Sequence, residues 1–363
     1  MKILFLSSHA HLVLERSTTR VSGGAELQIA LLARELAGRG FNVVIAAGDT
    51  GQKDGEIWDG VKIRNAGKFQ TGGLLDTLRA LPRVAQVIRE ERPDWVFLLG
   101  WTTWLFILHM LKLILGYRLG FICGLDIEVD GGFRRENPVR GAFFEWALHR
   151  CDVRFAMTND QRQLFQNNGM TCGFYRNLIL PRARPRAAQK TTDLLWVSRC
   201  QPIKRPHLFL DLAERLPEAK CLMVCPREDI GLWESVSTRV AGIPNVEFIE
   251  RVPYHEIQDV YDAAKIFVNT STGEGWPNSF IQSGLGATAL LSLDINPDGL
   301  FQNYRLGEFA AGDFERLVAG AAALLDDDKA VAQAQAECSR FVKELHNNCK
   351  EADAFLAGLE CSL

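Results

Sequence analysis

The segment KIFVNTSTGEGWPNSFIQSGLGATALLSLD, residues 265–294, carries the polar residues with the clearest chemical meaning. Its pattern predicts a strand, a glycine-flanked loop with Glu274, a short helix and a second strand. The free N–H groups at a helix start favour phosphate, so a carboxylate there must bind something else. Glu274 only accepts hydrogen bonds and suits sugar hydroxyls, whereas the backbone N–H groups of Gly275, Trp276 and Asn278 suit a phosphate. One loop would then bind both halves of a nucleotide-sugar.

Pro277 fits the first turn of the predicted helix, where proline loses no hydrogen bond, and it fixes the start of the helix and its dipole. From that start, Asn278 and Gln282 lie one turn apart on the same face. Taken alone, the segment is equally compatible with an ordinary strand-to-helix turn. In that alternative Glu274 is solvated and the glycines serve backbone geometry only.

A second polar group follows an earlier apolar run, in LLWVSRCQPIKRP. Arg199 and Lys204 bracket the loop, and Pro206 opens an amphipathic helix. Two cations at the carboxyl end of a strand in an open α/β sheet match the charge of a diphosphate. They would stabilise the negative charge that builds on a departing diphosphate during sugar transfer. A solvated basic loop is the alternative, and the presence of Glu274 in the same predicted sheet favours function.

The Arg–Lys pair and the loop EGWPNSFIQ together resemble the C-terminal half of glycosyltransferase family 4, retaining enzymes with the GT-B fold. The resemblance implies that Glu274 contacts hydroxyls of the donor sugar and that Arg199 and Lys204 bind the diphosphate. These three residues are the expected catalytic group. The family has a second Glu at the position of Gln282, where it binds the ribose hydroxyls. Glutamine still accepts a hydrogen bond there, without charge assistance.

Two further stretches bear on the resemblance. SLDINPDG, residues 292–299, is similar to family members that build polysaccharides, whereas GATALL, residues 286–291, departs from the usual Gly, Pro and Val pattern. Near the start of the chain, Gly23 and Gly24 match a Gly-Gly pair of the first loop, whose N–H groups approach the donor in the family. The surrounding residues do not complete the G-x-G-x-x-G of a dinucleotide fold, and by itself the pair indicates only a tight turn.

Apolar and helical patterns alternate along the chain, which predicts an α/β fold with parallel sheets covered on both faces. The resemblance implies a GT-B architecture of two Rossmann-like domains facing across a cleft. The expected boundaries are an N-terminal acceptor-binding domain (1–180), a polar linker (181–193), a nucleotide-sugar-binding domain (194–345) and a C-terminal helix packing back on the first domain (346–363). The predicted N-terminal strands lie near residues 2–7, 41–47, 94–99, 117–123, 152–157 and 172–176.

Composition narrows the class of protein. The chain has 363 residues, 47% of them hydrophobic, which is enough for two domains with separate cores. A net charge of −3 gives no electrostatic footprint for nucleic acid. Nine cysteines without a C-x-x-C pair argue against a disulfide framework and favour a reduced, cytoplasmic setting. The N-terminal sequence also lacks the layout of a signal peptide.

The run from Trp101 to Tyr117 is the most apolar of the chain. It is shorter than the roughly 20 residues that span a bilayer, and His109 and Lys112 interrupt it. A buried crossover helix is the favoured interpretation. The alternative is a peripheral membrane contact through an exposed apolar edge, assisted by the basic residues Arg134, Arg135 and Arg140.

Asp126, Glu128 and Asp130 alternate in a loop after a predicted strand. No His or fourth ligand accompanies them, and the cations Arg199 and Lys204 already supply the charge that a metal would bring. The resemblance also implies metal independence, so we expect neither a metal nor a cofactor. Asp126 is a candidate for contact with the donor or acceptor sugar, with simple solvation of the loop as the alternative.

These observations lead to one hypothesis and two alternatives. The hypothesis is a retaining glycosyltransferase that moves a sugar from a nucleotide-sugar to a glycan or a lipid-linked acceptor. The acceptor class, in cell-surface polysaccharide biosynthesis, follows from the resemblance alone. One alternative is a non-catalytic nucleotide-sugar-binding partner or sensor, in which Gln282 marks decayed catalysis. The other is a GT-B sugar epimerase or a phosphorylase, although the sequence shows no motif for the lysine-bound cofactor of a phosphorylase.

Overall fold

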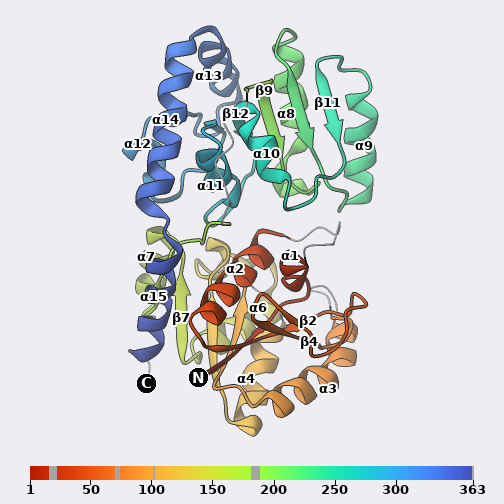
Figure 1. Cartoon of the computed structure of the whole chain (residues 1–363), viewed down its shortest axis with the longest axis vertical. Coiled ribbons are helices and arrows are strands. Elements are labelled where there is room, and N and C mark those ends of the chain that lie inside the picture. Colours follow the sequence, from red (N-terminus) through yellow and green to blue (C-terminus); the bar gives the residue numbers. More distant parts are fainter. Residues whose placement is uncertain (16–22, 70–73, 101–102, 181–188, 362–363) are drawn as a thin grey trace. The chain divides into compact units, whose positions relative to one another are not determined.

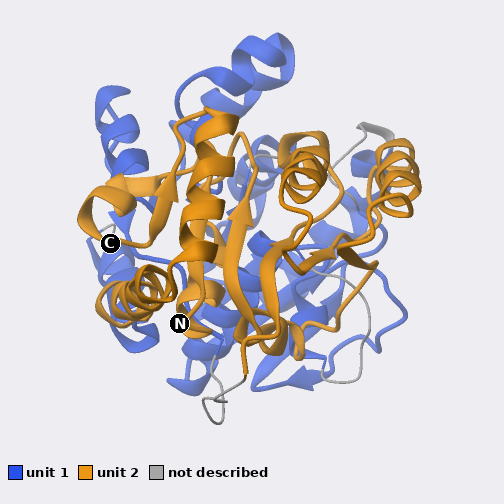
Figure 2. Ribbon diagram, turned by 90° about the horizontal axis from the view of Figure 1, so that it is seen from above, with its two compact units in different colours: residues 1–180, 347–363 blue, residues 181–346 orange. Residues whose placement is uncertain are grey.

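The computed structural model describes residues 1–15, 23–69, 74–100, 103–180 and 189–361. The chain divides into two compact units, which Figure 2 colours separately. Unit 1 comprises Met1–Leu180 and Asn347–Leu363, and unit 2 comprises Pro181–His346. Each unit is an α/β domain built on its own sheet.

Unit 1 has an eight-stranded sheet with the order β3-β4-β2-β1-β5-β6-β7-β8. Figure 1 labels its strands β2, β4 and β7. Neighbouring strands are parallel except β3 and β4, which are antiparallel. The strands are β1 (Lys2–Leu6), β2 (Asn42–Ala47), β3 (Ile57–Trp58), β4 (Val61–Asn65), β5 (Trp95–Leu99), β6 (Arg118–Ile122), β7 (Val153–Ala156) and β8 (Gly173–Phe174). The helices are α1 (His11–Leu14), α2 (Gly24–Gly38), α3 (Leu74–Glu91), α4 (Trp104–Leu115), α5 (Gly132–Glu136), α6 (Pro138–Leu148), α7 (Asn159–Asn167) and α15 (Asn348–Glu360), with a 3-10 turn η1 (Asp126–Glu128).

The continuous apolar runs of the sequence form the central strands of unit 1. All five residues of β5 are buried. Since successive side chains of a strand point to opposite faces, both faces of the sheet must be covered. The six predicted strands of this unit are confirmed, with bounds that shift by up to two residues.

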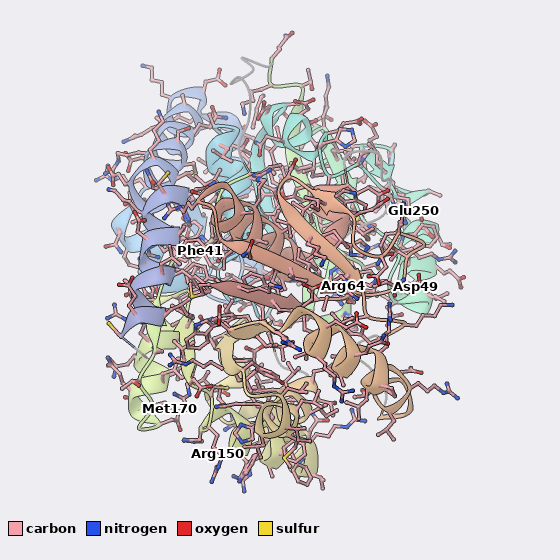
Figure 3. All side chains as sticks on the ribbon, turned by 60° about the horizontal axis from the view of Figure 1, so that its bottom comes forward. Phe41, Asp49, Arg64, Arg150, Met170 and Glu250 are labelled. Atoms are coloured by element: carbon pink, nitrogen blue, oxygen red, sulfur yellow. The ribbon has the colours of Figure 1, made fainter. Side chains whose placement is uncertain are left out.

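The pair β3 and β4 was not predicted from the sequence. In β4 the buried Val61 and Ile63 alternate with Lys62 and Arg64, so the strand lacks an apolar run. Arg64 is nevertheless buried, and its guanidinium pairs with Glu91 and with other carboxylates of the unit (Figure 3). A buried arginine with several carboxylate partners therefore occupies a position where an apolar residue would have indicated a strand.

Unit 2 has a six-stranded, fully parallel sheet with the order β11-β10-β9-β12-β13-β14. The strand β9 begins two residues before residue 194, the expected start of this domain, and residues 181–188 of the expected linker lie outside the described residues. The strands are β9 (Thr192–Val197), β10 (Cys221–Val224), β11 (Val246–Ile249), β12 (Ala264–Asn269), β13 (Ala289–Ser292) and β14 (Gly307–Phe309). The helices are α8 (Pro206–Arg215), α9 (Ile230–Val240), α10 (Ile257–Asp262), α11 (Asn278–Leu285), α12 (Leu300–Asn303), α13 (Phe314–Asp326) and α14 (Asp328–Leu345), with 3-10 turns η2 (Pro202–Lys204) and η3 (Pro297–Gly299).

Both sheets contain the doubly wound order, in which the first strand lies between the second strand and one that comes later in the chain. In unit 1 this places β1 beside β5, and in unit 2 it places β9 beside β12. The strand order reverses at these points, so the loops that follow the two neighbouring parallel strands diverge and leave room for a ligand. The fold therefore assigns one potential ligand site to the carboxyl edge of each sheet.

The C-terminal helix α15 belongs to unit 1 rather than to unit 2. The ring of Phe355 stacks on Phe155 of β7 at a centroid distance of 4.6 Å, and Asn348 exchanges hydrogen bonds with the backbone of Ile179. The chain thus returns to its first unit after completing the second. Among the described helices, none combines the length and the apolarity needed to cross a bilayer.

Candidate functional site

The loops after β9 and β12 hold most of the residues that the sequence singled out in unit 2. Leu194 and Leu195 of β9 pair with Ile266 and Phe267 of β12, so the two strands end side by side. The loop after β9 ends at η2 and leads into α8, whose first turn contains Pro206. The loop after β12 contains Glu274 and leads into α11. The predicted placement of both loops at one sheet edge follows from this pairing.

Lys204 and Glu274 meet directly at this edge. The ammonium Nζ of Lys204 lies 2.5 Å from Oε1 of Glu274, and the hydroxyl of Ser271 donates to the same oxygen at 2.8 Å. The two side chains are only 14% and 19% exposed. A cation and a hydrogen-bond acceptor therefore stand next to each other in a partly desolvated place, where their interactions with a ligand gain strength.

Arg205 joins the two loops through its side chain. Its Nε donates to the carbonyl of Thr270 at 2.6 Å, and its guanidinium also forms an ion pair with Asp294, which follows β13. The residue has a positive φ of 46°, which a non-glycine residue adopts only at some cost. The strain and the ion pair together indicate that the fold holds this residue in one specific place.

Thr270 completes the connection from the other side. Its hydroxyl donates to the carbonyl of Lys204 at 2.6 Å and accepts from Nε1 of Trp196 at 2.9 Å. The N–H of Thr272 donates to the carbonyl of Ile203 at 2.9 Å. Lys204 and Glu274 are thus held by a shared network of hydrogen bonds rather than by two independent loops. No local pattern in the sequence distinguishes Thr270, Arg205 or Asp294, because their contacts join positions up to 89 residues apart.

The helix that follows Glu274 begins one residue later than expected. Pro277 has an extended ψ of 120° and is the N-cap residue, so α11 starts at Asn278 rather than at the proline. Gly275 and Trp276 are buried, and Asn278 and Gln282 are half-buried one turn apart on α11. The loop from Glu274 to the start of the helix is therefore a packed element, with its side chains turned into the domain.

Arg199 lies apart from this network. Its guanidinium pairs with the carboxylate of Glu228 at 3.1 Å, and Nε2 of Gln201 donates to the same carboxylate at 2.6 Å. The Arg199 side chain is 41% exposed. From the sequence we expected Arg199 and Lys204 to act together on one ligand group. In the structure Arg199 pairs with Glu228, from the loop after β10, and Lys204 pairs with Glu274.

Unit 1 has a pocket at its own switch point, between β1 and β5. The pocket is small, with a volume of about 50 Å³, and its polar lining consists of Ser7, Ser8 and Glu26. Gly23 is the N-cap residue of α2 and Gly24 its first residue, so the predicted Gly-Gly pair starts the helix that carries Glu26. Sequence analysis did not select these three polar residues, although their positions directly after the first strand and the glycine pair were a usable signal.

The alternating carboxylates of unit 1 do not converge on one point. Asp126 and Glu128 lie in η1, where Glu128 is buried and accepts a hydrogen bond from the N–H of Gly124 at 2.8 Å. Asp130 accepts instead from the N–H of Gly132 at 2.5 Å. Among the described residues, no group of three His, Cys, Asp or Glu side chains is arranged to hold a metal ion.

Two family models match the chain, one in each unit. Residues 23–173 match a glycosyl transferase 4-like domain, and residues 191–327 match the glycosyl transferases group 1. No curated protein matches the sequence. The sequence evidence for the class of protein therefore comes from the two domain matches.

Three solved structures illustrate the similar folds, and each is distant in sequence. Anabaena HepE in complex with UDP and glucose has 16% identity and a TM-score of 0.75, over 99% of this chain and 100% of its own. Sucrose-phosphate synthase from Thermosynechococcus elongatus has 14% identity and a TM-score of 0.80, over 100% of both chains. A putative UDP-N-acetylglucosamine 2-epimerase from Listeria monocytogenes has 14% identity and a TM-score of 0.65, over 99% of this chain and 95% of its own.

These likenesses show the fold, and the domain matches show the class of protein. The expected α/β architecture with two parallel-sheet domains is confirmed. Since glycosyltransferase models match both of its domains, the chain belongs to the two-domain glycosyltransferases of the GT-B architecture.

Proposed function

We propose that this chain is a retaining family 4 glycosyltransferase that acts on a nucleotide-sugar donor and a glycan or lipid-linked acceptor in cell-surface polysaccharide biosynthesis. The observation that carries the proposal is the direct contact of Lys204 with Glu274 at the switch point of unit 2. In the proposed complex Lys204 and Arg199 bind the diphosphate, Glu274 binds hydroxyls of the sugar and Gln282 binds the ribose. The backbone N–H groups of Gly275, Trp276 and Asn278 contribute to the phosphate site.

The ion pair suits such a donor because each partner has a replacement in the ligand. Phosphate oxygens replace the carboxylate as the partner of Lys204, and sugar hydroxyls replace the ammonium as the donor to Glu274. The two groups of the protein are adjacent, as are the diphosphate and the sugar of the ligand. When the donor binds, Arg199 either leaves Glu228 and pairs with the diphosphate, or stays with Glu228 and attracts the diphosphate from a longer distance.

The proposed reaction breaks the bond between the anomeric carbon and the diphosphate oxygen. The acceptor hydroxyl forms the new bond to the anomeric carbon on the same face, and its proton passes to the departing phosphate oxygen. Lys204 stabilises the charge that develops on the diphosphate, which makes electrostatics and positioning the main sources of acceleration. We propose that this cation takes the role of a metal, so that neither a metal nor a cofactor takes part.

The acceptor is assigned to unit 1. The small pocket between β1 and β5 places the polar groups of Ser7, Ser8 and Glu26 after the first strand of the unit, where they can contact hydroxyls of a glycan bound at this edge of the sheet. Gly23, Gly24 and Asp126 are the remaining candidates for sugar contact in this unit. We also propose a cytoplasmic location, where thiols stay reduced. In support, most of the cysteines are buried as core side chains.

Calorimetric binding of UDP, GDP and ADP in the presence of a chelator, followed by transfer assays with the matching nucleotide-sugars, tests the proposal. Lys204→Ala should weaken nucleotide binding and lower turnover at least about a hundredfold, given about 3 kcal/mol for one stabilising donor. Lys265→Ala is the matched control. Lys265 lies at the start of β12, at the end of the strand away from Glu274, and forms an ion pair with Asp193 of β9. Unchanged turnover of Lys204→Ala would exclude the assigned diphosphate site.

The same assays separate the two alternatives. A non-catalytic partner or sensor binds a nucleotide but transfers no sugar to any acceptor. An epimerase changes the sugar of the nucleotide-sugar without transferring it to an acceptor. The similar fold of a putative epimerase does not distinguish transfer from epimerisation, so the products of the reaction have to be identified.

A further inference from the structure

Two neighbouring helices of unit 1 carry a concentration of exposed apolar side chains. Of the twelve large hydrophobic residues that are exposed in the described part of the chain, six lie on α4 and α6. Single exposed apolar residues are normal on a soluble protein, but a contiguous group marks an interaction surface. We call this group the α4–α6 face, and it consists of Met110, Leu113, Ile114, Val139, Phe143 and Trp146.

The six residues form one surface because the two helices pack against each other. Phe106 of α4 contacts the rings of Phe143 and Trp146 at centroid distances of 4.9 Å and 5.6 Å, and His109 contacts Trp146 at 4.9 Å. The two helices run side by side in unit 1 (Figure 1). These ring contacts join α6 to α4, so the two helices present their exposed apolar side chains next to each other.

Helical spacing gives each helix its own exposed stripe. Val139, Phe143 and Trp146 lie at positions i, i+4 and i+7 of α6, which is one face of a helix. Leu113 and Ile114 end α4, and they are 67% and 77% exposed. Such exposed aliphatic side chains at the end of a helix gain free energy only if something apolar covers them.

Cationic side chains border the face. The guanidinium of Arg150 lies 4.3 Å from the ring centroid of Trp146, and Arg150 is exposed at the surface of unit 1 (Figure 3). Arg140 is exposed on α6. Within the described part of the chain, neither arginine forms an ion pair with a carboxylate. The nearby Lys112 and Arg134, in contrast, are neutralised by Asp152 and Glu145.

We propose that the α4–α6 face docks on the surface of a membrane that contains anionic lipid. An apolar surface with aromatic side chains and bordering arginines fits the boundary between acyl chains and anionic headgroups. The arginines supply the charge complementarity to the anionic headgroups. The docking is independent of the donor site, since these residues belong to another unit from Lys204 and Glu274.

Vesicle flotation of the whole chain without nucleotide tests this inference. Vesicles of phosphatidylcholine alone are compared with vesicles that also contain phosphatidylglycerol. The wild type should float with the anionic vesicles, and Leu113→Gln combined with Ile114→Gln should lower the partition coefficient at least about tenfold. Ile230→Gln in α9 is the matched control, because Ile230 is 62% exposed but lies outside the face. The control should bind like the wild type.

The arginines are tested separately. Arg140→Gln combined with Arg150→Gln should lower binding to the anionic vesicles at least about fivefold, and added salt should have a similar effect on the wild type. Circular dichroism and thermal unfolding verify that each variant is folded. A wild type that floats with neither kind of vesicle would overturn the inference, as would variants that float unchanged. A dimer that the Leu113 and Ile114 changes dissociate, without vesicle binding, would assign the face to a second copy of the chain.

Discussion

Arg205 forms an ion pair with Asp294 while its Nε donates to the carbonyl of Thr270, so one side chain joins the ends of three neighbouring strands. The arginine follows Lys204 directly, and Thr270 follows the last residue of β12. The distance between Lys204 and Glu274 therefore depends on residues that need not touch a ligand. Arg205 and Asp294 are positioning residues in this arrangement.

Replacement of Arg205 by Gln should lower the free energy of unfolding by about 2 kcal/mol, because it breaks a charged hydrogen-bond network that is partly buried. Transferase activity should fall through kcat more than through KM, since the variant keeps the groups that bind the donor but loses their exact spacing. Thermal unfolding and steady-state kinetics with a nucleotide-sugar measure the two effects. Arg215→Gln is the control, because Arg215 forms an ion pair with Glu315 at the surface.

The backbone of Arg205 allows a second comparison at the same position. Because its φ is 46°, alanine is strained there and glycine is not. Arg205→Gly should therefore be about 1 kcal/mol more stable than Arg205→Ala, although both lose the side chain. Equal stability of the two variants would mean that the loop relaxes when the guanidinium is removed.

Gln282→Glu should tighten the binding of nucleotide if Gln282 binds the ribose as proposed. A charged acceptor makes a hydrogen bond roughly twice as strong as a neutral one, so we expect a gain of about 1 kcal/mol, or about fivefold in affinity. Calorimetry with UDP or the preferred nucleotide measures the change. The gain should disappear with the 2′,3′-dideoxy nucleotide, and a gain that persists would show that the carboxylate acts on another part of the ligand.

Much of the fold was accessible from the sequence because its central strands are buried on both faces. Runs such as Leu194 to Trp196 are apolar at every position, and such runs mark parallel strands without any tertiary information. The strand β4, which lies between β3 and β2, was not predicted because Arg64 is buried there with carboxylate partners. Hydrophobic patterning fails wherever paired charges take the place of apolar side chains.

The candidate site was accessible only in part, for a related reason. Lys204 and Glu274 stand out because their residue types and neighbouring glycines or prolines suggest a ligand. The network that positions them depends on Thr270 and Asp294, whose residue types are common in any loop. Likewise, Arg199 looked equivalent to Lys204 in the sequence, and only the fold reveals its pairing with Glu228. Contacts between loops follow from strand order, which local patterns do not specify.

Gly284→Ala tests the packing of the helix that carries Asn278 and Gln282. Alanine usually stabilises a helix relative to glycine, but a Cβ at this position would lie 2.3 Å from Cγ2 of Val342 and 2.5 Å from the carbonyl of Cys338. Overpacking should lower the free energy of unfolding by about 1–3 kcal/mol. Gly38→Ala is the control, because a Cβ there meets no atom within 4 Å. A stable Gly284→Ala variant would mean that α11 and α14 separate easily.

Lys190 should make the stability of unit 2 dependent on pH. Its ammonium donates to the carbonyl of Gly286 and to the hydroxyl of Thr288, and burial lowers the pKa of Lys190 from 10.5 to about 8. Between these two pH values the unfolded chain binds more protons at this residue than the folded chain does, so the free energy of unfolding rises with pH.

Lys190→Gln removes this titration and keeps a hydrogen-bond donor for the carbonyl of Gly286. Relative to this variant, the wild type should therefore gain stability as the pH rises from about 8 towards 10.5. Thermal unfolding of both proteins at a series of pH values gives the difference directly, since the groups common to both cancel. A constant difference across this range would show that Lys190 keeps its ordinary pKa in the folded chain, and that its hydrogen bonds offset the cost of burial.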